Sequence, residues 1–213
     1  MAAPVTDYAS LQAAIKSYLW DRQDVADQAP VFISLCEAQL NRRLKTRRMT
    51  GRATATIESD FAMVPSDFAG VQSFYLAGTP PIRLQFAADP QAIVEMKAVR
   101  SADTGQPEAF TVVGDQFEFC PAPAPDTSYT AYLTYYKRLP ALSDANTGNW
   151  LLTDHPDAYL YGSLLQSAPW LKEDERIVTW GNLYTQIIAD IQDADRRETS
   201  AHHIRMPDRF NVV

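Results

Sequence analysis

The stretch Arg42–Glu58, RRLKTRRMTGRATATIE, contains the point at which the sequence changes from a helical to a strand pattern. Up to Leu44 the apolar residues recur at helical spacing. From Thr50 the period changes, and small and β-branched residues alternate with two-residue spacing through residues 53–58. A β-rich segment therefore follows a helical one, and the rest of the chain shows whether the helices return.

Two amphipathic helices are predicted before the switch. In the first, Thr6 can serve as the N-cap and Asp7 lies favourably in the first turn. The second begins near Pro30, because proline is well tolerated in a first helical turn. The apolar stripes are Tyr8, Leu11, Ile15, Tyr18 and Leu19 in the first helix, and Phe32, Ile33, Cys36, Leu40 and Leu44 in the second.

Strand patterns continue after the switch. Residues 71–76 form a second β-prone run, with a turn at residues 64–68 before it. Asp89 and Pro90 predict the start of a short helix, and residues 110–119 predict a hairpin around Gly114–Asp115. Tyr129–Lys137 predicts another strand. Its two faces carry Tyr132, Thr134 and Tyr136 on one side and Ala131, Leu133 and Tyr135 on the other.

Helical spacing returns after a loop that runs from Pro140 to Asn149. One helix begins at Pro156, and the longest helix carries Ile177, Trp180, Tyr184, Ile187, Ile188 and Ile191. We therefore predict an α+β fold, in which N- and C-terminal helix pairs form a bundle around an inserted β-rich domain. The expected segments are residues 1–49 (helices), 50–149 (β-rich domain), 150–199 (helices) and 200–213 (an extended C-terminal arm).

The composition excludes several classes of protein. The chain has 213 residues, a net charge of −7 and two cysteines. Its longest uncharged stretch, residues 68–82, is too short and too proline-rich to span a membrane, and nothing at its start indicates a signal peptide. Cys36 and Cys120 are expected to be buried thiols, as is typical of a reducing compartment. The acidity argues against a dedicated sequence-reading nucleic-acid binder.

No strong catalytic, cofactor or metal motif is present in the sequence. His155 and the pair His202–His203 are candidates for metal binding or proton transfer, and Glu173, Asp174 and Glu175 are candidates for paired carboxylates. For each, the structural interpretation is favoured: a polar helix start, a polar tail and a first helical turn, respectively. We therefore expect no catalytic residue, no cofactor and no metal.

A basic cluster lies within the opening stretch of this acidic chain. It consists of Arg42, Arg43, Lys45, Arg47, Arg48 and Arg52. Three interpretations remain open, namely a solvated helix end, a contact with nucleic acid, and one half of a charged protein interface. Trp150 is similarly open, since it can plug a neighbouring surface or cover the core.

Several local strings resemble the adaptor, or head-to-tail connector, proteins of tailed bacteriophages. They span most of the chain up to Thr199 in the expected order, and none carries reactive chemistry. The strings are residues 6–11 (TDYASL), 37–44 (EAQLNRRL), 64–68 (VPSDF), 139–143 (LPALS), 149–152 (NWLL) and 155–162 (HPDAYLYG).

The resemblance implies a structural protein of the virion neck, assembled in the host cytoplasm. About twelve copies would form a ring between the portal protein and the tail or nozzle protein, and genomic DNA would pass through its lumen without sequence recognition. In such relatives a C-terminal arm often reaches toward the portal. The residues expected at the subunit or portal interface are Arg42, Arg43, Arg47, Arg48, Trp150, Arg205, Arg209 and Phe210. The alternatives are a carboxylate-dependent hydrolase and a DNA-binding accessory protein.

Overall fold

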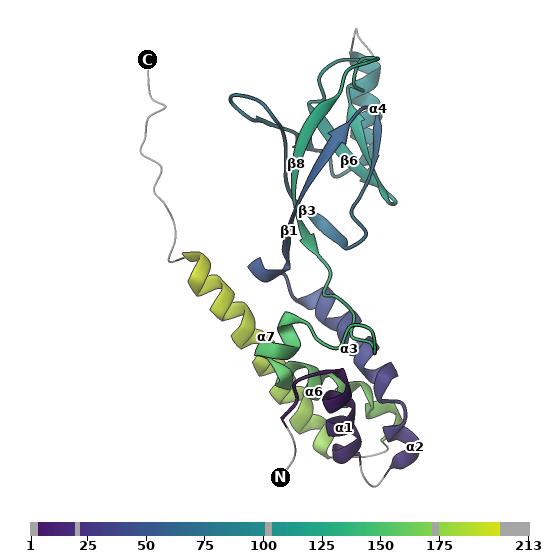
Figure 1. Ribbon diagram of the computed structural model, residues 1–213, viewed down its shortest axis with the longest axis vertical. Coiled ribbons are helices and arrows are strands. Elements are labelled where there is room, and N and C mark those ends of the chain that lie inside the picture. Colours follow the sequence, from purple (N-terminus) through teal and green to yellow (C-terminus); the bar gives the residue numbers. More distant parts are fainter. Residues whose placement is uncertain (1–3, 20–21, 101–103, 172–174, 201–213) are drawn as a thin grey trace. The chain divides into compact units, whose positions relative to one another are not determined.

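The computed structural model describes residues 4–19, 22–100, 104–171 and 175–200. The chain divides into two compact units, a helical unit (residues 1–47 and 139–213) and a β-rich unit (Arg48–Arg138). The fold is therefore α+β (Figure 1). The segment from Leu139 to Asn149 belongs to the helical unit.

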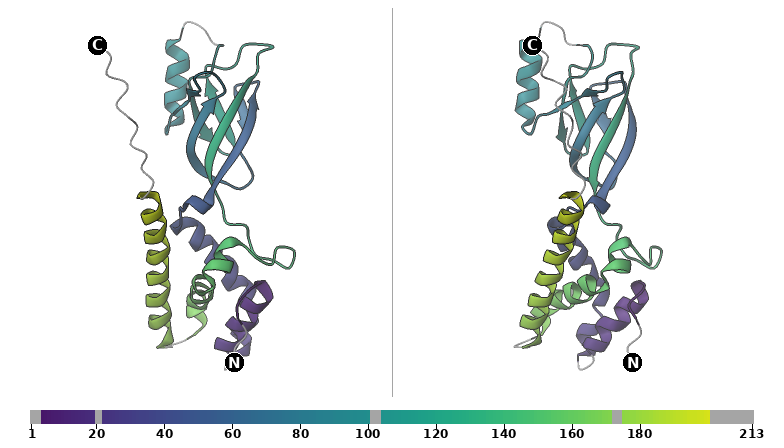
Figure 2. Two further views of the ribbon diagram at one scale, coloured as in Figure 1. Left: turned by 60° about the vertical axis from the view of Figure 1, so that its left-hand side comes forward. Right: turned by 90° about the vertical axis from the view of Figure 1, so that its left-hand side faces the viewer.

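The helical unit is organised around one central helix. Helix α6 contacts α1, α3, α5 and α7 (Figure 2). Two short helices, α2 and α5, are additional to the predicted helix pairs. The elements of this unit are α1 (Tyr8–Tyr18), α2 (Gln23–Ala26), α3 (Ala29–Arg43), α5 (Trp150–Asp154), α6 (Pro156–Gln166), the 3-10 turn η2 (Ala168–Trp170) and α7 (Arg176–Ser200).

The start of α1 differs from the predicted one. Asp7, rather than Thr6, is the N-cap, and its carboxylate accepts a hydrogen bond from the Ser10 backbone N–H at 2.8 Å. The Ser10 hydroxyl in turn accepts from the Asp7 backbone N–H, which completes a capping box. The prediction that Thr6 caps this helix was wrong because a carboxylate with a serine at the third helical position satisfies two backbone amides at once.

Most residues of the predicted apolar stripes are buried in the core of the helical unit, whereas Tyr18 is exposed. Their spacing places each stripe on one helix face, and packing those faces together supplies most of the stability of such helices. The buried side chains are Leu11 and Ile15 of α1, Phe32, Ile33, Cys36 and Leu40 of α3, Tyr159 and Leu164 of α6, and Trp180, Tyr184, Ile188 and Ile191 of α7.

The β-rich unit contains two four-stranded sheets. In the first, the strand order is β1-β8-β3-β4, and in the second it is β2-β7-β6-β5. The strands are β1 (Thr50–Ile57), β2 (Phe61–Met63), β3 (Phe68–Leu76), β4 (Ile82–Arg83), β5 (Gln85–Phe86), β6 (Ala109–Val113), β7 (Gln116–Cys120) and β8 (Tyr129–Lys137). The short 3-10 turn η1 (Arg47–Met49) precedes β1.

An aromatic core lies between the two sheets. Phe74 of β3 lies 5.1 Å, centroid to centroid, from Phe110 of β6 and 5.2 Å from Phe117 of β7. The tilted and edge-to-face geometries of these pairs are those that aromatic rings prefer. Ala131, Leu133 and Tyr135, one of the two predicted faces of β8, join the same cluster.

Helix α4 (Pro90–Val99) contacts β6 and β7 of the second sheet. As predicted, Asp89 caps it, accepting a hydrogen bond from Gln91 at 2.9 Å. Ile93 packs with Ala109 and Cys120, so the outward side chains of this sheet are also buried. The predicted hairpin is confirmed as β6 and β7, with Gly114 at φ +60° in the turn.

We predict that Gly162→Ala destabilises the helical unit. A Cβ at this position in α6 would lie 2.5 Å from the Cys36 Sγ and 2.9 Å from a ring carbon of Tyr184. Overpacking of this kind costs about 1–3 kcal/mol of unfolding free energy. All four tryptophans lie in the helical unit, so their fluorescence in a urea titration reports its unfolding.

Gly181→Ala in α7 is the matched control. Its Cβ would meet only Leu165, at an ordinary 3.8 Å, and alanine favours a helix by about 0.5–1 kcal/mol over glycine. Equal urea midpoints for the two variants would contradict the proposed tight contact at Gly162.

Candidate functional site

The sequence candidates for chemistry do not come together in the described residues. Within residues 4–19, 22–100, 104–171 and 175–200, no group of three or more His, Cys, Asp or Glu side chains could hold a metal ion. His155 is the N-cap residue of α6, and its side chain makes no capping hydrogen bond. Cys36 and Cys120 are buried free thiols, as predicted, and burial raises the pKa of Cys36 to about 12.

Other candidates lie outside the described residues. They are Glu173, Asp174, His202, His203, Arg205, Arg209 and Phe210. Within the described part of the chain, no helix combines the length and the apolar character that are needed to cross a bilayer.

The buried carboxylate Glu37 of α3 holds the loop that leads back into the helical unit. One of its oxygens accepts hydrogen bonds from the Leu142 backbone N–H at 2.8 Å and from the Tyr159 hydroxyl at 3.3 Å. Burial raises the pKa of Glu37 above its ordinary value, and the two hydrogen bonds oppose that shift. The carboxylate is therefore a structural acceptor that fixes a loop.

Asn149 and Asn41 extend this hydrogen-bonded cluster. The Asn149 amide donates to the Tyr159 hydroxyl at 2.7 Å and to the Pro140 carbonyl at 2.9 Å, while its oxygen accepts from Leu152. The Asn41 side chain accepts from the Leu139 backbone N–H at 2.8 Å. Four of the strings that carry the phage resemblance, residues 37–44, 139–143, 149–152 and 155–162, therefore meet in one cluster.

A fifth string makes its contacts in the β-rich unit. Asp67, within residues 64–68, accepts a hydrogen bond from the Tyr135 hydroxyl at 2.8 Å, and its backbone carbonyl accepts from the Arg138 N–H. The turn before β3 is thus fastened to the end of β8. These strings share a structural role, because each positions a loop or a turn.

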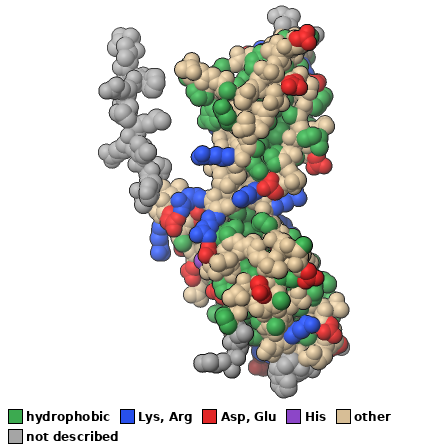
Figure 3. All heavy atoms as spheres, in the orientation of Figure 1, with side chains coloured by type: hydrophobic (Ala, Val, Ile, Leu, Met, Phe, Trp, Pro, Cys, Tyr) green, Lys and Arg blue, Asp and Glu red, His purple; other side chains and the backbone are tan. Residues whose placement is uncertain are grey.

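The basic cluster is partly neutralised by α7. The Arg47 backbone N–H donates to the Asp195 carboxylate at 3.0 Å, and the Arg47 guanidinium pairs with Asp195 and Glu198. The Arg43 guanidinium lies over the Tyr184 ring, 5.8 Å from its centroid. Figure 3 shows basic and acidic side chains mixed where the last turns of α7 reach the surface. Arg47 is therefore already paired within its own chain.

The other predicted interface residues lie on separate elements. Arg42 is exposed in the last turn of α3, where a positive charge suits the helix dipole. Arg48 is exposed and begins the β-rich unit, and Trp150 is the half-buried first residue of α5. Burial of Leu151 and Leu152 beside Trp150 shows that this short helix contributes mainly to the core.

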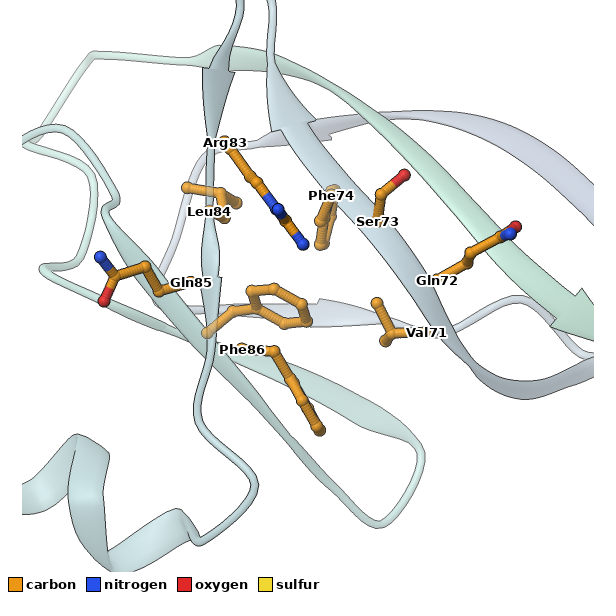
Figure 4. A pocket seen from close by; sticks show the side chains of 9 residues that line it. Val71, Gln72, Ser73, Phe74, Arg83, Leu84, Gln85 and Phe86 are labelled. Carbon is orange, nitrogen blue, oxygen red and sulfur yellow. The ribbon is translucent and has the colours of Figure 1, made fainter. Parts of the chain in front are cut away.

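A groove of about 480 Å³ opens on the β-rich unit, and the sequence analysis did not find it. Figure 4 shows the Arg83, Phe74, Phe86 and Val71 side chains directed toward a common space. Phe86 is 54% exposed, although its ring lies 5.3 Å from that of the core residue Phe110. Because β4 and β5 have two residues each, no alternating pattern marks this wall of the groove in the sequence.

These features define a class of protein. The buried polar groups hold loops in place, and large apolar side chains such as Val31 and Phe86 are exposed on the two units, which suits a protein that contacts others through its surfaces. The family model for the SU10 adaptor protein matches residues 6–205, and the chain belongs to that family. It is thus a bacteriophage adaptor protein, a component of the virion neck. No curated protein matches the chain.

The family match covers more of the chain than the resemblance found in the sequence, which ended at Thr199. It continues to residue 205 and so includes the first residues after α7. Hydrogen-bonded loops and turns, rather than reactive groups, are what the matching strings share within the described structure.

We predict that Glu37→Leu lowers the free energy of unfolding of the helical unit by about 1–3 kcal/mol. The substitution leaves the Leu142 N–H and the Tyr159 hydroxyl without their acceptor. Glu37→Gln is the control, because an amide oxygen can accept both hydrogen bonds without a buried charge. Tryptophan fluorescence in urea measures both variants.

The same carboxylate gives a pH dependence of defined sign. Because the pKa of Glu37 is raised in the folded state, its contribution to stability is full below its ordinary pKa of 4.5 and is lost as the pH rises through the folded-state pKa. Wild type should therefore lose stability relative to Glu37→Gln as the pH is raised over that window. A difference that does not change with pH would contradict this assignment.

Proposed function

We propose that about twelve copies of this adaptor form a ring between the portal protein and the tail or nozzle protein, joining head to tail. The family match over residues 6–205 carries this proposal. The two-unit fold supports it, since two separate compact units can present one surface to neighbouring copies and another to a different component. Assembly takes place in the host cytoplasm.

The proposed role is structural rather than enzymatic. The buried carboxylate Glu37 is engaged by Leu142 and Tyr159, and both of its hydrogen bonds serve to hold a loop. The helix bundle, built from residues 1–49 and 150–199, is the proposed ring-forming body, and the inserted β-rich domain faces a neighbouring component.

The charge of the chain supports a channel for the genome. About twelve copies with a net charge of −7 would together carry roughly −84. An acidic lumen repels the phosphates of DNA, so that the genome passes without sticking and without sequence recognition.

The proposed subunit and portal interfaces use the basic cluster, Trp150 and the C-terminal arm. Arg42, Arg43, Arg47 and Arg48 face acidic surface on an adjacent subunit, while the arm contributes Arg205, Arg209 and Phe210. The internal pairing of Arg47 with Asp195 and Glu198 would extend into this interface as a charged network.

Electron microscopy of the chain mixed with purified portal protein tests the proposed function. A ring of this protein stacked on the portal ring is the expected result. The mixture is the informative sample, because a ring can depend on the portal as its template. Absence of any portal association across a range of protein concentrations would overturn the proposal.

We predict that Arg42→Glu combined with Arg43→Glu raises the concentration needed for half-maximal assembly on the portal by at least about tenfold. The double variant also loses the Arg43 contact with the Tyr184 ring and two favourable charges in the last turn of α3, so a small fall in the melting temperature of the subunit is expected beside the larger loss of assembly. Lys16→Glu combined with Arg22→Glu is the control, with the same change in net charge; it removes two exposed ion pairs and the hydrogen bond from Arg22 to the Trp170 carbonyl. Equal assembly by the two double variants would argue against the basic cluster as an interface.

A further inference from the structure

The groove on the β-rich unit runs along an edge of strand β3 that is largely without a partner strand in the described structure. Within the described part of the chain, strand β4 pairs with Tyr75 and Leu76 of β3 alone, and the Leu84 N–H bonds to the Phe74 carbonyl at 2.9 Å. Before Phe74, the strands of the described structure offer this edge of β3 no partner. The edge over residues 70–73 therefore presents backbone groups that can pair with an added strand.

The opposite wall of the groove, formed by the second sheet, also has a short edge strand. Strand β5 pairs with β6 in parallel over Ala109 and Phe110 only. Leu84 is buried where the chain crosses from the first sheet to the second, so one end of this side of the sandwich is closed. The remaining length is open and is lined by exposed Phe86 and half-buried Val71, while the rings of Phe74 and Phe110 are already buried in the core. An inserted strand would cover Phe86 and Val71 as well as the edge.

Arg83 supplies the polar part of the groove. Its side chain is exposed and extends from β4 toward the space beside Phe74 and Phe86 (Figure 4). Among the residues that the structure describes, it forms no ion pair or hydrogen bond. A guanidinium beside apolar walls suits a ligand that combines a carboxylate with apolar side chains.

The chain itself contains a segment with this chemistry, residues 208–213 (DRFNVV). Side chains alternate between the two sides of an extended strand, so Asp208, Phe210 and Val212 would share one side. Pro207 comes directly before this segment, and proline is tolerated at the first residue of a strand. Residues 201–207 can span up to about 25 Å, so the segment is not confined to the end of α7.

We propose that residues 208–213 add as a strand to the open edge of β3 and fill the groove. Asp208 pairs with Arg83, and Phe210 and Val212 pack against Phe86 and Val71. The backbone hydrogen bonds to residues 70–73 supply affinity, and the alternate side chains supply specificity, as in other strand additions. This docking belongs to the unassembled chain, because Phe210 must leave the groove before it can take part in the proposed portal interface.

Amide hydrogen exchange of residues 70–73 tests this proposal in the full chain and in a chain that ends at Ser200. The shorter chain keeps every described helix and strand. Successive N–H groups of a strand point to opposite sides, so only some of the amides of residues 70–73 face the open edge rather than β8. Those amides should exchange at least about tenfold more slowly in the full chain, because hydrogen bonds to the added strand protect them. A synthetic peptide of residues 204–213, added to the shorter chain, should restore the protection.

Exchanging the charges of Arg83 and Asp208 distinguishes specific docking from a general effect of charge on amide exchange. Arg83→Glu in the full chain should remove the protection, and Arg83→Glu combined with Asp208→Arg should restore it. Arg52→Glu is the matched control, since Arg52 is an exposed arginine on β1, at the opposite edge of the same sheet. Thermal melting checks that each variant is folded.

Two outcomes would overturn the proposal. One is equal exchange at residues 70–73 in the full and the shortened chain, which would leave the groove to another protein. The other is equal loss of protection in Arg83→Glu and Arg52→Glu. Because these measurements use the isolated chain, their result is independent of whether a ring forms on the portal.

Discussion

The pairing of β1 with β8 is the constraint on which the two-unit fold depends. Thr50, near the start of the β-rich unit, lies opposite Tyr136, near its end, so the two ends of the inserted unit meet in one antiparallel ladder. The helical unit fixes the chain at the same two boundaries, just before and just after the inserted unit. Asp195 accepts from the Arg47 N–H and Asn41 accepts from the Leu139 N–H. An insertion with adjacent, fixed ends leaves the helices on either side free to pack together.

Much of the secondary structure could be predicted because its signals are local. Tyr129–Lys137 is a strand with the predicted ends, since a long alternating run is bounded by turn residues. The Asp89 cap and the Pro156 helix start are likewise confirmed, since the Asp89 carboxylate accepts a hydrogen bond from the nearby Gln91 N–H and proline is well suited to a first helical turn. Failures came where distant residues decide. The strands β4 and β5 are too short for a period, and partners elsewhere in the two sheets define them.

Charge clustering in the sequence was a poorer guide than hydrophobic spacing. The six basic residues between Arg42 and Arg52 stand out in an acidic chain, yet Arg47 finds Asp195 and Glu198 on a helix almost 150 positions away. Periodicity predicts a buried face because one element determines it. A charge has no such geometric signature, since its partner can come from anywhere in the chain. The folded structure is therefore needed to tell which basic residues already have an acidic partner within their own chain.

The groove follows from the way in which the sandwich is closed. The chain crosses from one sheet to the other within residues 82–86, and Leu84 is buried at this crossing. Because the crossing is so short, the edge strands β4 and β5 have only two residues each. Natural sheets usually cover or charge such edges, because an open one pairs with other chains. Here the only charge on the short crossing is Arg83, beside exposed Ile82 and Phe86. A single cation does not block an edge. It selects for a strand with a carboxylate, and this makes the edge a specific site rather than a general hazard.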